Sequence, residues 1–354
     1  MDFLTSANPR VVFAFWLGVV VIAMALLMLL VIIVMRQMVM RRERNRIRAA
    51  TQWHQVLLDS AQGLGTSLPA LPRADLAGFV DAWNHVHQTL GGHDDSGLQR
   101  VASEIGLESH LYLAIDHGNF HNRVMAIIAL GYIKGCTHFD KLARYLDDRS
   151  TILSLSAARS LMHIDPARAV TLLVPHIVER SDWPQGGVAQ ILHDANPALV
   201  SKELSEVTLQ ANADVAPRLI RFLADVSPAE AAPVIRRILA SPPDDHLVST
   251  CLQVMTDPAD LDLIRSLLAH ERWHVRMHAA AALGRMGEAG DEQRLLPLLA
   301  DPQWWVRYRC AQALSRLPHM EEHGMQRLRA MQTDRFACDV LDQVIAERNM
   351  GVNQ

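Results

Sequence analysis

Two stretches of the sequence are near copies of each other: WHVRMHAAAALGRMG at residues 273–287 and WWVRYRCAQALSRLP at residues 304–318. Trp, Val, Arg, Ala and Leu recur in both at an offset of 31 residues. The apolar residues in each stretch follow the spacing of an amphipathic helix. An internal period of this length is typical of repeat proteins, whose short helices bury their apolar faces only against neighbouring copies.

The period continues toward the N-terminus. Each copy ends its apolar stretch at one leucine, Leu283 or Leu314, and earlier stretches end at comparable positions. We assign these positions, spaced 29 or 31 residues apart, to Leu130, Leu161, Leu192, Leu223 and Val254. A second apolar helix follows each stretch, and proline stands where four of these helices should begin, at Pro166, Pro197, Pro228 and Pro258. Proline suits the first position of a helix, because the N–H that it lacks would have no partner there.

The repeat resembles the HEAT-repeat family, and in particular its short bacterial form, which is also seen in phycobilin-lyase-type repeat proteins. The residues that carry the resemblance in the last unit are Asp301, Pro302, Trp304, Val306, Arg307, Ala311, Ala313 and Leu314. Those in the preceding unit are Trp273, Val275, Arg276, Ala280, Ala282, Leu283 and Gly284. The resemblance implies an all-α fold, with an α-solenoid of about seven helix pairs over residues 119–318. It also implies a structural role for Arg276 and Arg307, which we expect to pair with loop acids such as Asp301.

Helical segments flank the array on both sides. Residues 75–118 predict two amphipathic helices, 76–90 and 98–115, which we interpret as the N-terminal cap. Residues 319–354 predict the opposite cap, because a terminal repeat would otherwise expose its apolar face. The residues of this cap that we expect to face inward are Phe336, Val340, Leu341, Val344 and Ile345.

The N-terminal region contains a candidate membrane anchor. Residues 11–35 hold no charged side chain over 25 consecutive positions. A helix of this length exceeds the roughly 30 Å hydrocarbon core of a bilayer, so the run predicts a single transmembrane helix. A cleaved signal peptide is the alternative, but the apolar run is too long for one and Arg36 follows it directly. Residues 36–74 then predict a basic juxtamembrane helix and a linker.

The charges that flank the apolar run predict its orientation. Residues 36–48 contain one acid, Glu43, and six arginines, which are Arg36, Arg41, Arg42, Arg44, Arg46 and Arg48. Residues 1–10 carry only one charge of each sign. Because arginine clusters stay on the cytoplasmic side, residues 1–10 should form a short extracytoplasmic N-terminus, and the domain after the anchor should lie in the cytoplasm. We therefore predict a single-pass protein of the inner membrane.

The remaining sequence is acidic. Residues 49–354 carry a net charge of −9, since the whole chain has −4 and residues 36–48 contribute +5. An acidic surface excludes nucleic acid as the expected partner, because the phosphate backbone requires a basic surface. The four cysteines lie far apart, which excludes a disulfide framework and a zinc ribbon.

One short motif matches a zinc-hydrolase pattern: His270, Glu271 and His274 fit H-E-x-x-H. That chemistry needs both histidines on one face of one helix, with the glutamate activating a zinc-bound water. The repeat register argues against it, because the first two residues of the motif align with Asp301 and Pro302, ahead of the next helix. We therefore predict no metal and no catalytic residue at this motif, and no cofactor for the chain.

Four tryptophans lie at comparable places near the starts of first helices: Trp183, Trp273, Trp304 and Trp305. Large aromatic side chains are mostly buried in proteins, so packing between adjacent units is the commoner role for them. The alternative is an exposed aromatic strip that grips a partner peptide. These four residues are the candidates for binding a partner.

Two functions fit the sequence. The first is a non-enzymatic scaffold that is tethered to the membrane and binds a protein partner, with no small-molecule substrate. An accessory subunit of a bacterial envelope or polysaccharide-synthesis machine would be such a protein. The second is an enzyme, either a zinc hydrolase that uses His270, Glu271 and His274 or a lyase of the phycobilin-attachment type. We favour the scaffold, because the sequence holds no glycine-rich phosphate loop and no nucleophilic Ser or Cys signature.

Overall fold

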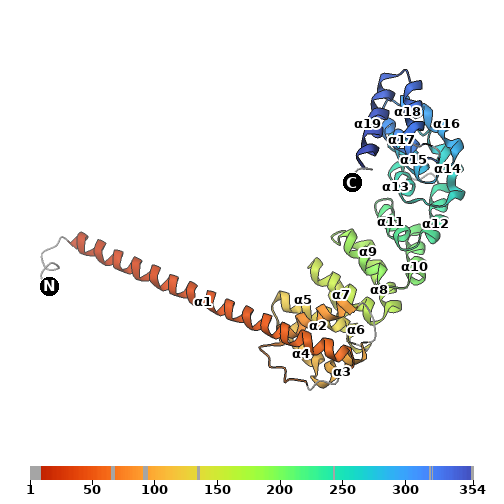
Figure 1. The fold of residues 1–354 in the computed structure, drawn as a ribbon. Helices are drawn as coiled ribbons and strands as arrows, with labels where there is room; N and C mark the ends of the chain where they lie inside the picture. Colours follow the sequence, from red (N-terminus) through yellow and green to blue (C-terminus); the bar gives the residue numbers. More distant parts are fainter. Residues whose placement is uncertain are drawn as a thin grey trace. The chain divides into compact units, whose positions relative to one another are not determined.

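The computed structural model describes residues 9–64, 68–90, 95–133, 136–241, 244–318, 320 and 322–351. The predicted N-terminal segment 1–10 therefore lies outside the described residues up to Asn8. The described part of the chain is helical and holds no β-strand, which confirms the predicted all-α fold (Figure 1). The chain divides into two compact units, Met1–Leu142 and Ala143–Gln354.

The first unit contains one very long helix and several short ones. Its elements are α1 (Pro9–Ala61), α2 (Leu76–Leu90), α3 (Ser96–Glu104), α4 (Leu107–His117), α5 (Phe120–Gly131), η1 (Cys136–His138) and α6 (Phe139–Ala143). α1 is a single helix of 53 residues. No proline or glycine occurs between residues 19 and 61, so nothing in the sequence breaks the helix after the apolar run.

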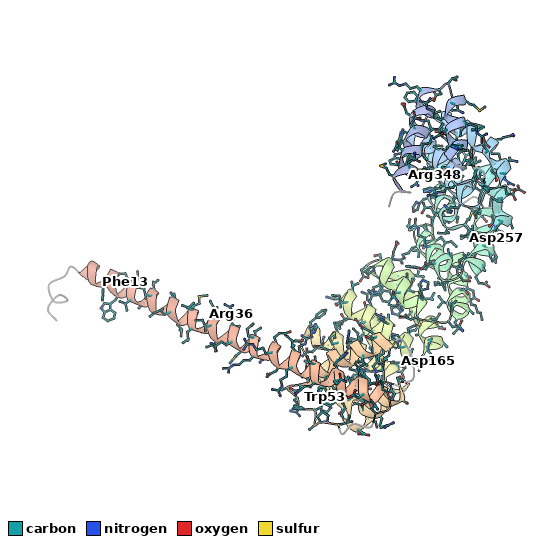
Figure 2. All side chains as sticks on the ribbon, in the orientation of Figure 1. Phe13, Arg36, Trp53, Asp165, Asp257 and Arg348 are labelled. Carbon is teal, nitrogen blue, oxygen red and sulfur yellow. The ribbon has the colours of Figure 1, made fainter. Side chains whose placement is uncertain are left out.

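The N-terminal part of α1 is apolar and exposed. Large hydrophobic side chains of this part are more than half exposed; examples are Trp16, Leu26 and Phe13, of which Figure 2 labels the last. By length and composition the helix can cross a membrane. Soluble proteins rarely expose a continuous apolar surface of this size, so the segment has the character expected for residues 11–35.

The last turns of α1 belong to the core of the first unit. Ala49, Trp53 and Leu57, spaced four residues apart, are buried. The Trp53 ring, labelled in Figure 2, meets Phe79 of α2 edge-on with ring centroids 4.9 Å apart. One helix therefore carries both the apolar segment and part of a packed core.

The predicted helix over residues 98–115 is in fact two helices. α3 ends at Glu104, and α4 begins at Leu107 after Gly106, whose φ of +60° is left-handed. A residue with a Cβ rarely adopts that conformation, so the glycine permits the turn between α3 and α4. The other predicted helix of this region, 76–90, matches α2.

The second unit is a succession of helix pairs. Its elements are η2 (Arg144–Asp147), α7 (Thr151–Ile164), α8 (Pro166–Glu179), α9 (Gln185–His193), α10 (Pro197–Gln210), α11 (Ala216–Val226), α12 (Pro228–Ala240), α13 (Asp245–Val254), η3 (Pro258–Asp260), α14 (Leu261–Leu267), α15 (Trp273–Met286), η4 (Ala289–Asp291), α16 (Glu292–Leu295), η5 (Leu296–Ala300), α17 (Trp304–Arg316), α18 (Glu322–Met331) and α19 (Arg335–Gly351). First helices pack against first helices, as α13, α15 and α17 do, and the second helices α8, α10 and α12 form another layer (Figure 1). This stacking is the predicted α-solenoid.

The second helices begin at the predicted prolines. α8, α10, α12 and η3 have as their first residues Pro166, Pro197, Pro228 and Pro258. The residue before each proline caps the helix, because its side chain accepts a backbone N–H; these caps are Asp165, Asn196, Ser227 and Asp257. A cap followed by proline fixes where a helix starts.

The core follows the predicted repeat positions with one correction. The buried repeat leucines are Leu130, Leu161, Leu192, Leu223, Leu283 and Leu314. Val254 is partly exposed, whereas Leu252 is fully buried, so Leu252 is the repeat position in α13. The single 29-residue interval therefore precedes this position instead of following it. Val254 and Leu252 both end an apolar stretch, and spacing alone does not choose between them.

The two helices after the last repeat bury most of their predicted apolar residues. Val340, Leu341 and Val344 of α19 are buried, as expected. The prediction that Phe336 faces inward is wrong, since 60% of this residue is exposed. The Arg307 guanidinium lies 5.2 Å from the centroid of the Phe336 ring, so a cation–π contact replaces burial.

Candidate partner-binding surface

Arginine–aspartate pairs join successive units of the array. Arg276 of α15 donates two hydrogen bonds, at 2.7 and 3.0 Å, to the Asp301 carboxylate of the next unit. The same pairing recurs between second helices, as Arg236–Asp260 and Arg265–Asp291. All three carboxylates are buried, so these pairs hold neighbouring units together. The expected structural role of Arg276 is confirmed.

Arg307 departs from this pattern although it is the repeat equivalent of Arg276. Its guanidinium donates to the carbonyl oxygens of Asp301 and Pro302 in its own loop. Within the described residues it has no carboxylate partner, and it lies over Phe336 instead. The expected ion pair is therefore wrong for Arg307, because no further repeat supplies an aspartate.

One of the four candidate tryptophans is buried. Trp183 is 4% exposed, and its indole N–H donates to the hydroxyl of Ser154 at 2.9 Å. It stands just before α9 and makes this bond to α7, so it joins two successive units. Trp183 therefore has the packing role and contributes nothing to an outer surface.

The other three tryptophans are exposed. Trp273, Trp304 and Trp305 are exposed by 39%, 39% and 52%. Trp304 stacks on Tyr308 with centroids 5.0 Å apart, and Trp305 meets Trp304 edge-on at 4.7 Å. We call Trp304, Trp305 and Tyr308 the aromatic cluster. The sequence analysis did not predict Tyr308 as part of this surface, although its position one helical turn after Trp304 indicates that the two rings can meet.

A line of polar and basic side chains runs along one face of the first helices. The residues spaced as one face of α17 are Trp305, Arg309, Gln312 and Arg316, and their equivalents 31 positions earlier on α15 are His274, His278, Ala281 and Arg285. Hydrogen bonds extend this line, since Arg221 of α11 donates to Gln253 of α13 and the Gln253 amide lies 3.0 Å from His278 Nε2. We call these basic residues, with Gln253, the basic strip: Arg221, Gln253, His274, His278, Arg285, Arg309 and Arg316. Sequence analysis missed it, although its recurrence at the repeat offset was visible.

The H-E-x-x-H residues do not share one helix. His270 and Glu271 precede α15, and only His274 lies within it. The His270 ring accepts the N–H of Arg272 and lies 3.8 Å from the Asp245 carboxylate. Among the residues that the structure describes, no group of three His, Cys, Asp or Glu side chains is arranged to hold a metal ion.

The buried thiols of the array serve packing. Burial raises the pKa of Cys251 to about 12. Burial likewise raises the pKa of Cys310, whose Sγ donates to the Leu295 carbonyl at 3.0 Å. Burial of both thiols thus disfavours the thiolate that a nucleophile or a metal ligand requires.

The arginines that follow the apolar run fall into two groups. Five of them are exposed on α1: Arg36, Arg41, Arg42, Arg44 and Arg48. Arg46 instead pairs with Asp81 of α2, and its Nη2 lies 2.8 Å from His121 Nε2. Arg46 thus fastens α1 to the first unit in addition to adding positive charge beside the apolar run.

Comparison with known proteins identifies the repeat. Residues 247–315, which cover α13 to α17, match the family model of HEAT repeats. No curated protein matches the chain. Among known structures, the chain is similar to a homology model of the full-length AP-3 complex in an intermediate open conformation. That similarity has a TM-score of 0.39 and 13% identity over 81% of this chain, and it spans 56% of the other chain.

Proposed function

We propose that the chain is a membrane-tethered cytoplasmic scaffold that binds a protein partner through its HEAT repeats and performs no catalysis itself. The observation that carries this proposal is the aromatic cluster on α17. Trp304 and Trp305 are adjacent at the start of α17, and both are exposed. Tryptophan and tyrosine at a surface are the residues that most often dominate protein–protein binding energy.

The cluster is also preorganised for binding. Trp304 and Tyr308 stack with their planes only 7° apart, and Trp305 is held against Trp304 at an interplanar angle of 78°. The Tyr308 hydroxyl donates to Glu347 of α19 at 2.9 Å, which fixes the ring from its far end. A partner therefore meets rings already in place, so little side-chain entropy is lost on binding.

We propose that α1 supplies the tether, with the N-terminus outside and the repeats in the cytoplasm. The exposed apolar surface of α1 and the five exposed arginines after residue 35 support this arrangement. A tether confines the partner near the membrane and raises its effective concentration there. A bacterial envelope or polysaccharide-synthesis machine is the setting that we propose for such a partner.

We retain the predicted division of the chain as part of the proposal. The anchor is residues 11–35, the juxtamembrane segment 36–74, the N-terminal cap 75–118, the array 119–318 and the C-terminal cap 319–354. The continuity of α1 from the anchor to Ala61 supports a mechanical link between the anchor and the N-terminal cap.

Photo-crosslinking in native membranes tests the scaffold role. A benzophenone amino acid placed at Gln303, an exposed position beside the cluster, should capture a discrete partner from the full-length protein. The double variant Trp304→Ala and Trp305→Ala should reduce this capture by about tenfold or more, because truncating aromatic anchors removes most of the binding energy.

A matched control removes apolar surface elsewhere. Leu199 and Leu209 of α10 are exposed by 41% and 36% on a second helix. The double variant Leu199→Ala and Leu209→Ala should leave capture at Gln303 within about twofold of the wild type. Equal losses in both double variants, or no captured protein at all, would contradict the proposal.

A further inference from the structure

The arginines of the second unit fall into two classes according to what neutralises them. Many of them meet carboxylates, on first helices as well as on second helices and loops, and such pairs are Arg159–Asp194, Arg180–Asp182, Arg236–Asp260, Arg265–Asp291, Arg276–Asp301 and Arg329–Asp342. On the basic strip they do not. Within the described residues, no carboxylate lies at ion-pair distance from Arg221, Arg285, Arg309 or Arg316.

Three of the strip arginines donate hydrogen bonds to uncharged groups of the protein. Arg285 donates to the Leu252 carbonyl at 2.7 Å, and Arg309 donates to Gln312 of its own helix at 2.9 Å. Arg221 donates to Gln253 at 3.2 Å. A guanidinium is always charged and prefers a carboxylate in a forked arrangement, so these contacts leave most of its charge uncompensated.

The protonation state of His278, at the centre of the strip, is affected by this excess of positive charge. Its Nε2 accepts the amide of Gln253, whose carbonyl oxygen already takes the Arg221 hydrogen bond, so the imidazole is neutral. Burial, and then the charges of the basic groups around it, lower the pKa of His278 to about 4. Those basic groups belong to four strip residues on three helices, Arg309, His274, Arg285 and Arg221.

Uncompensated arginines are unexpected in an acidic region. Residues 49–354 carry a net charge of −9, so carboxylates are abundant, yet in the part of the chain that the structure describes none forms an ion pair with the strip arginines. Two acids of the neighbouring helices have other partners: Asp225 of α11 pairs with His193, and Glu347 of α19 accepts from Tyr308. A carboxylate from outside the chain would therefore find guanidinium groups without a competing acid.

We propose that the basic strip binds an acidic segment of the protein partner, whose Asp and Glu side chains pair with Arg285, Arg309 and Arg316 while an apolar side chain contacts Trp305. Trp305 begins the same helical face that carries Arg309 and Arg316, so one extended segment can reach both chemistries. This inference rests on the proposed scaffold function and specifies the chemistry of the partner.

Nucleic acid fits the strip less well than an acidic peptide. The face from Trp305 to Arg316 extends about 17 Å along α17, which is enough for a few residues of extended peptide. A nucleic acid strand would continue past the strip onto a region of net negative charge, where its phosphates are repelled.

Fluorescence anisotropy with the full-length protein in lipid nanodiscs tests the proposal. The probes are fluorescein-labelled poly-L-glutamate, a random Glu–Leu copolymer, and oligodeoxythymidylate of matched charge. The variant Arg309→Glu and Arg316→Glu should weaken binding of both acidic polymers by about tenfold or more, because charge reversal places like charges together. Both side chains are exposed, and Arg309 contacts only its own helix, so an unchanged melting temperature is expected.

The control variant makes the same change of charge on the other layer. Lys202 of α10 and Arg237 of α12 are exposed, and Lys202→Glu with Arg237→Glu should leave binding of the acidic polymers within about twofold of the wild type. Equal losses in the two variants, no binding by the wild type, or tighter binding of oligodeoxythymidylate than of the acidic polymers would each overturn the inference.

The outcome for the strip can be separated from that for the scaffold. If photo-crosslinking at Gln303 still captures a partner in the Arg309→Glu and Arg316→Glu protein, the acidic-segment inference fails and the scaffold function stands. If capture depends on these two arginines and on the aromatic cluster, both hold. If no partner is captured by the wild type, the scaffold function fails even where poly-L-glutamate binds.

Discussion

Gly284 is the point of closest approach between two successive first helices. A Cβ on this residue of α15 would lie 2.5 Å from the Cα and 2.7 Å from the Cβ of Ala313 on α17. Because the obstacle is backbone, Gly284→Ala must push the helices apart, and we expect a loss of about 1–3 kcal/mol in the free energy of unfolding. Urea denaturation of the detergent-solubilised chain, followed by tryptophan fluorescence, measures it.

A second glycine provides the control for that substitution. A Cβ on Gly290 would meet no atom within 4 Å. Gly290→Ala should therefore change the free energy of unfolding by no more than about 0.5 kcal/mol. A cost at Gly290 equal to that at Gly284 would show that helix separation is not what the denaturation reports.

The neutral state of His278 makes stability depend on pH. Its pKa is about 4 in the folded protein, below the ordinary value of 6.5. Between these two values the unfolded chain binds more protons than the folded one, so stability falls as pH falls through this window. In the wild type the urea concentration at the midpoint of unfolding should decrease between pH 7 and pH 5, and His278→Gln should make this decrease smaller. Urea denaturation of both proteins at each pH measures it.

The matched change for this experiment lies on the outside of α13. His246 is exposed, and His246→Gln should leave the pH dependence as it is in the wild type. If both substitutions flatten the curve equally, the effect belongs to histidine content and not to the surroundings of His278.

At the scale of single elements, Trp53 is the largest buried side chain through which α1 packs against the first unit. Trp53 is 3% exposed and meets the Phe79 ring edge-on. Trp53→Ala should cost about 3–5 kcal/mol and release the end of α1 from α2. Limited proteolysis should then cut between Ala61 and Leu76 earlier than in the wild type.

Ile47 tests whether any apolar truncation on α1 has this effect. It lies on the same helix but is 58% exposed. Ile47→Ala should leave the proteolysis pattern unchanged. Rapid cleavage in the Ile47→Ala protein would show that the junction is weak in itself.

Element boundaries were predictable wherever spacing along the chain determines them. Pro166 and the prolines equivalent to it start second helices, and Leu314 and its equivalents are buried, because both features depend on local sequence. The break between α3 and α4 was missed, because it depends on the backbone conformation of Gly106. The exposure of Phe336 was missed for a tertiary reason, namely the guanidinium of Arg307 beside it.

The candidate surface was predictable only in part. Sequence placed four tryptophans at comparable positions, but their exposure depends on neighbours in space. Trp183 is buried with its N–H bonded to the Ser154 hydroxyl, whereas Trp304 stacks on Tyr308 and stays at the surface. The basic strip needed the structure, since only the structure shows which arginines have carboxylate partners.

For the whole molecule, the proposed orientation makes a direct prediction. A reporter that is active only in the cytoplasm, fused after Gln354, should be active, because the arginines after residue 35 keep the following region inside. Replacing the five exposed arginines by glutamine should produce a mixed population. Activity of an extracytoplasmic reporter fused to the unaltered chain would refute the orientation.

Because α1 is unbroken, the number of residues between the apolar run and the core of the first unit fixes the rotation of that core about the helix axis and its distance along the axis. Ala49 becomes buried about 20 Å beyond Arg36 along the helix, and no loop lies between them to absorb a change. Each residue inserted among the exposed arginines would turn the first unit by about 100° about the helix axis and raise it by about 1.5 Å. Three alanines would turn it by about 300°, whereas seven would restore its facing to within about 20° at a greater height. The rotation of the first unit's core about the α1 axis therefore repeats periodically as residues are inserted between that core and the apolar run.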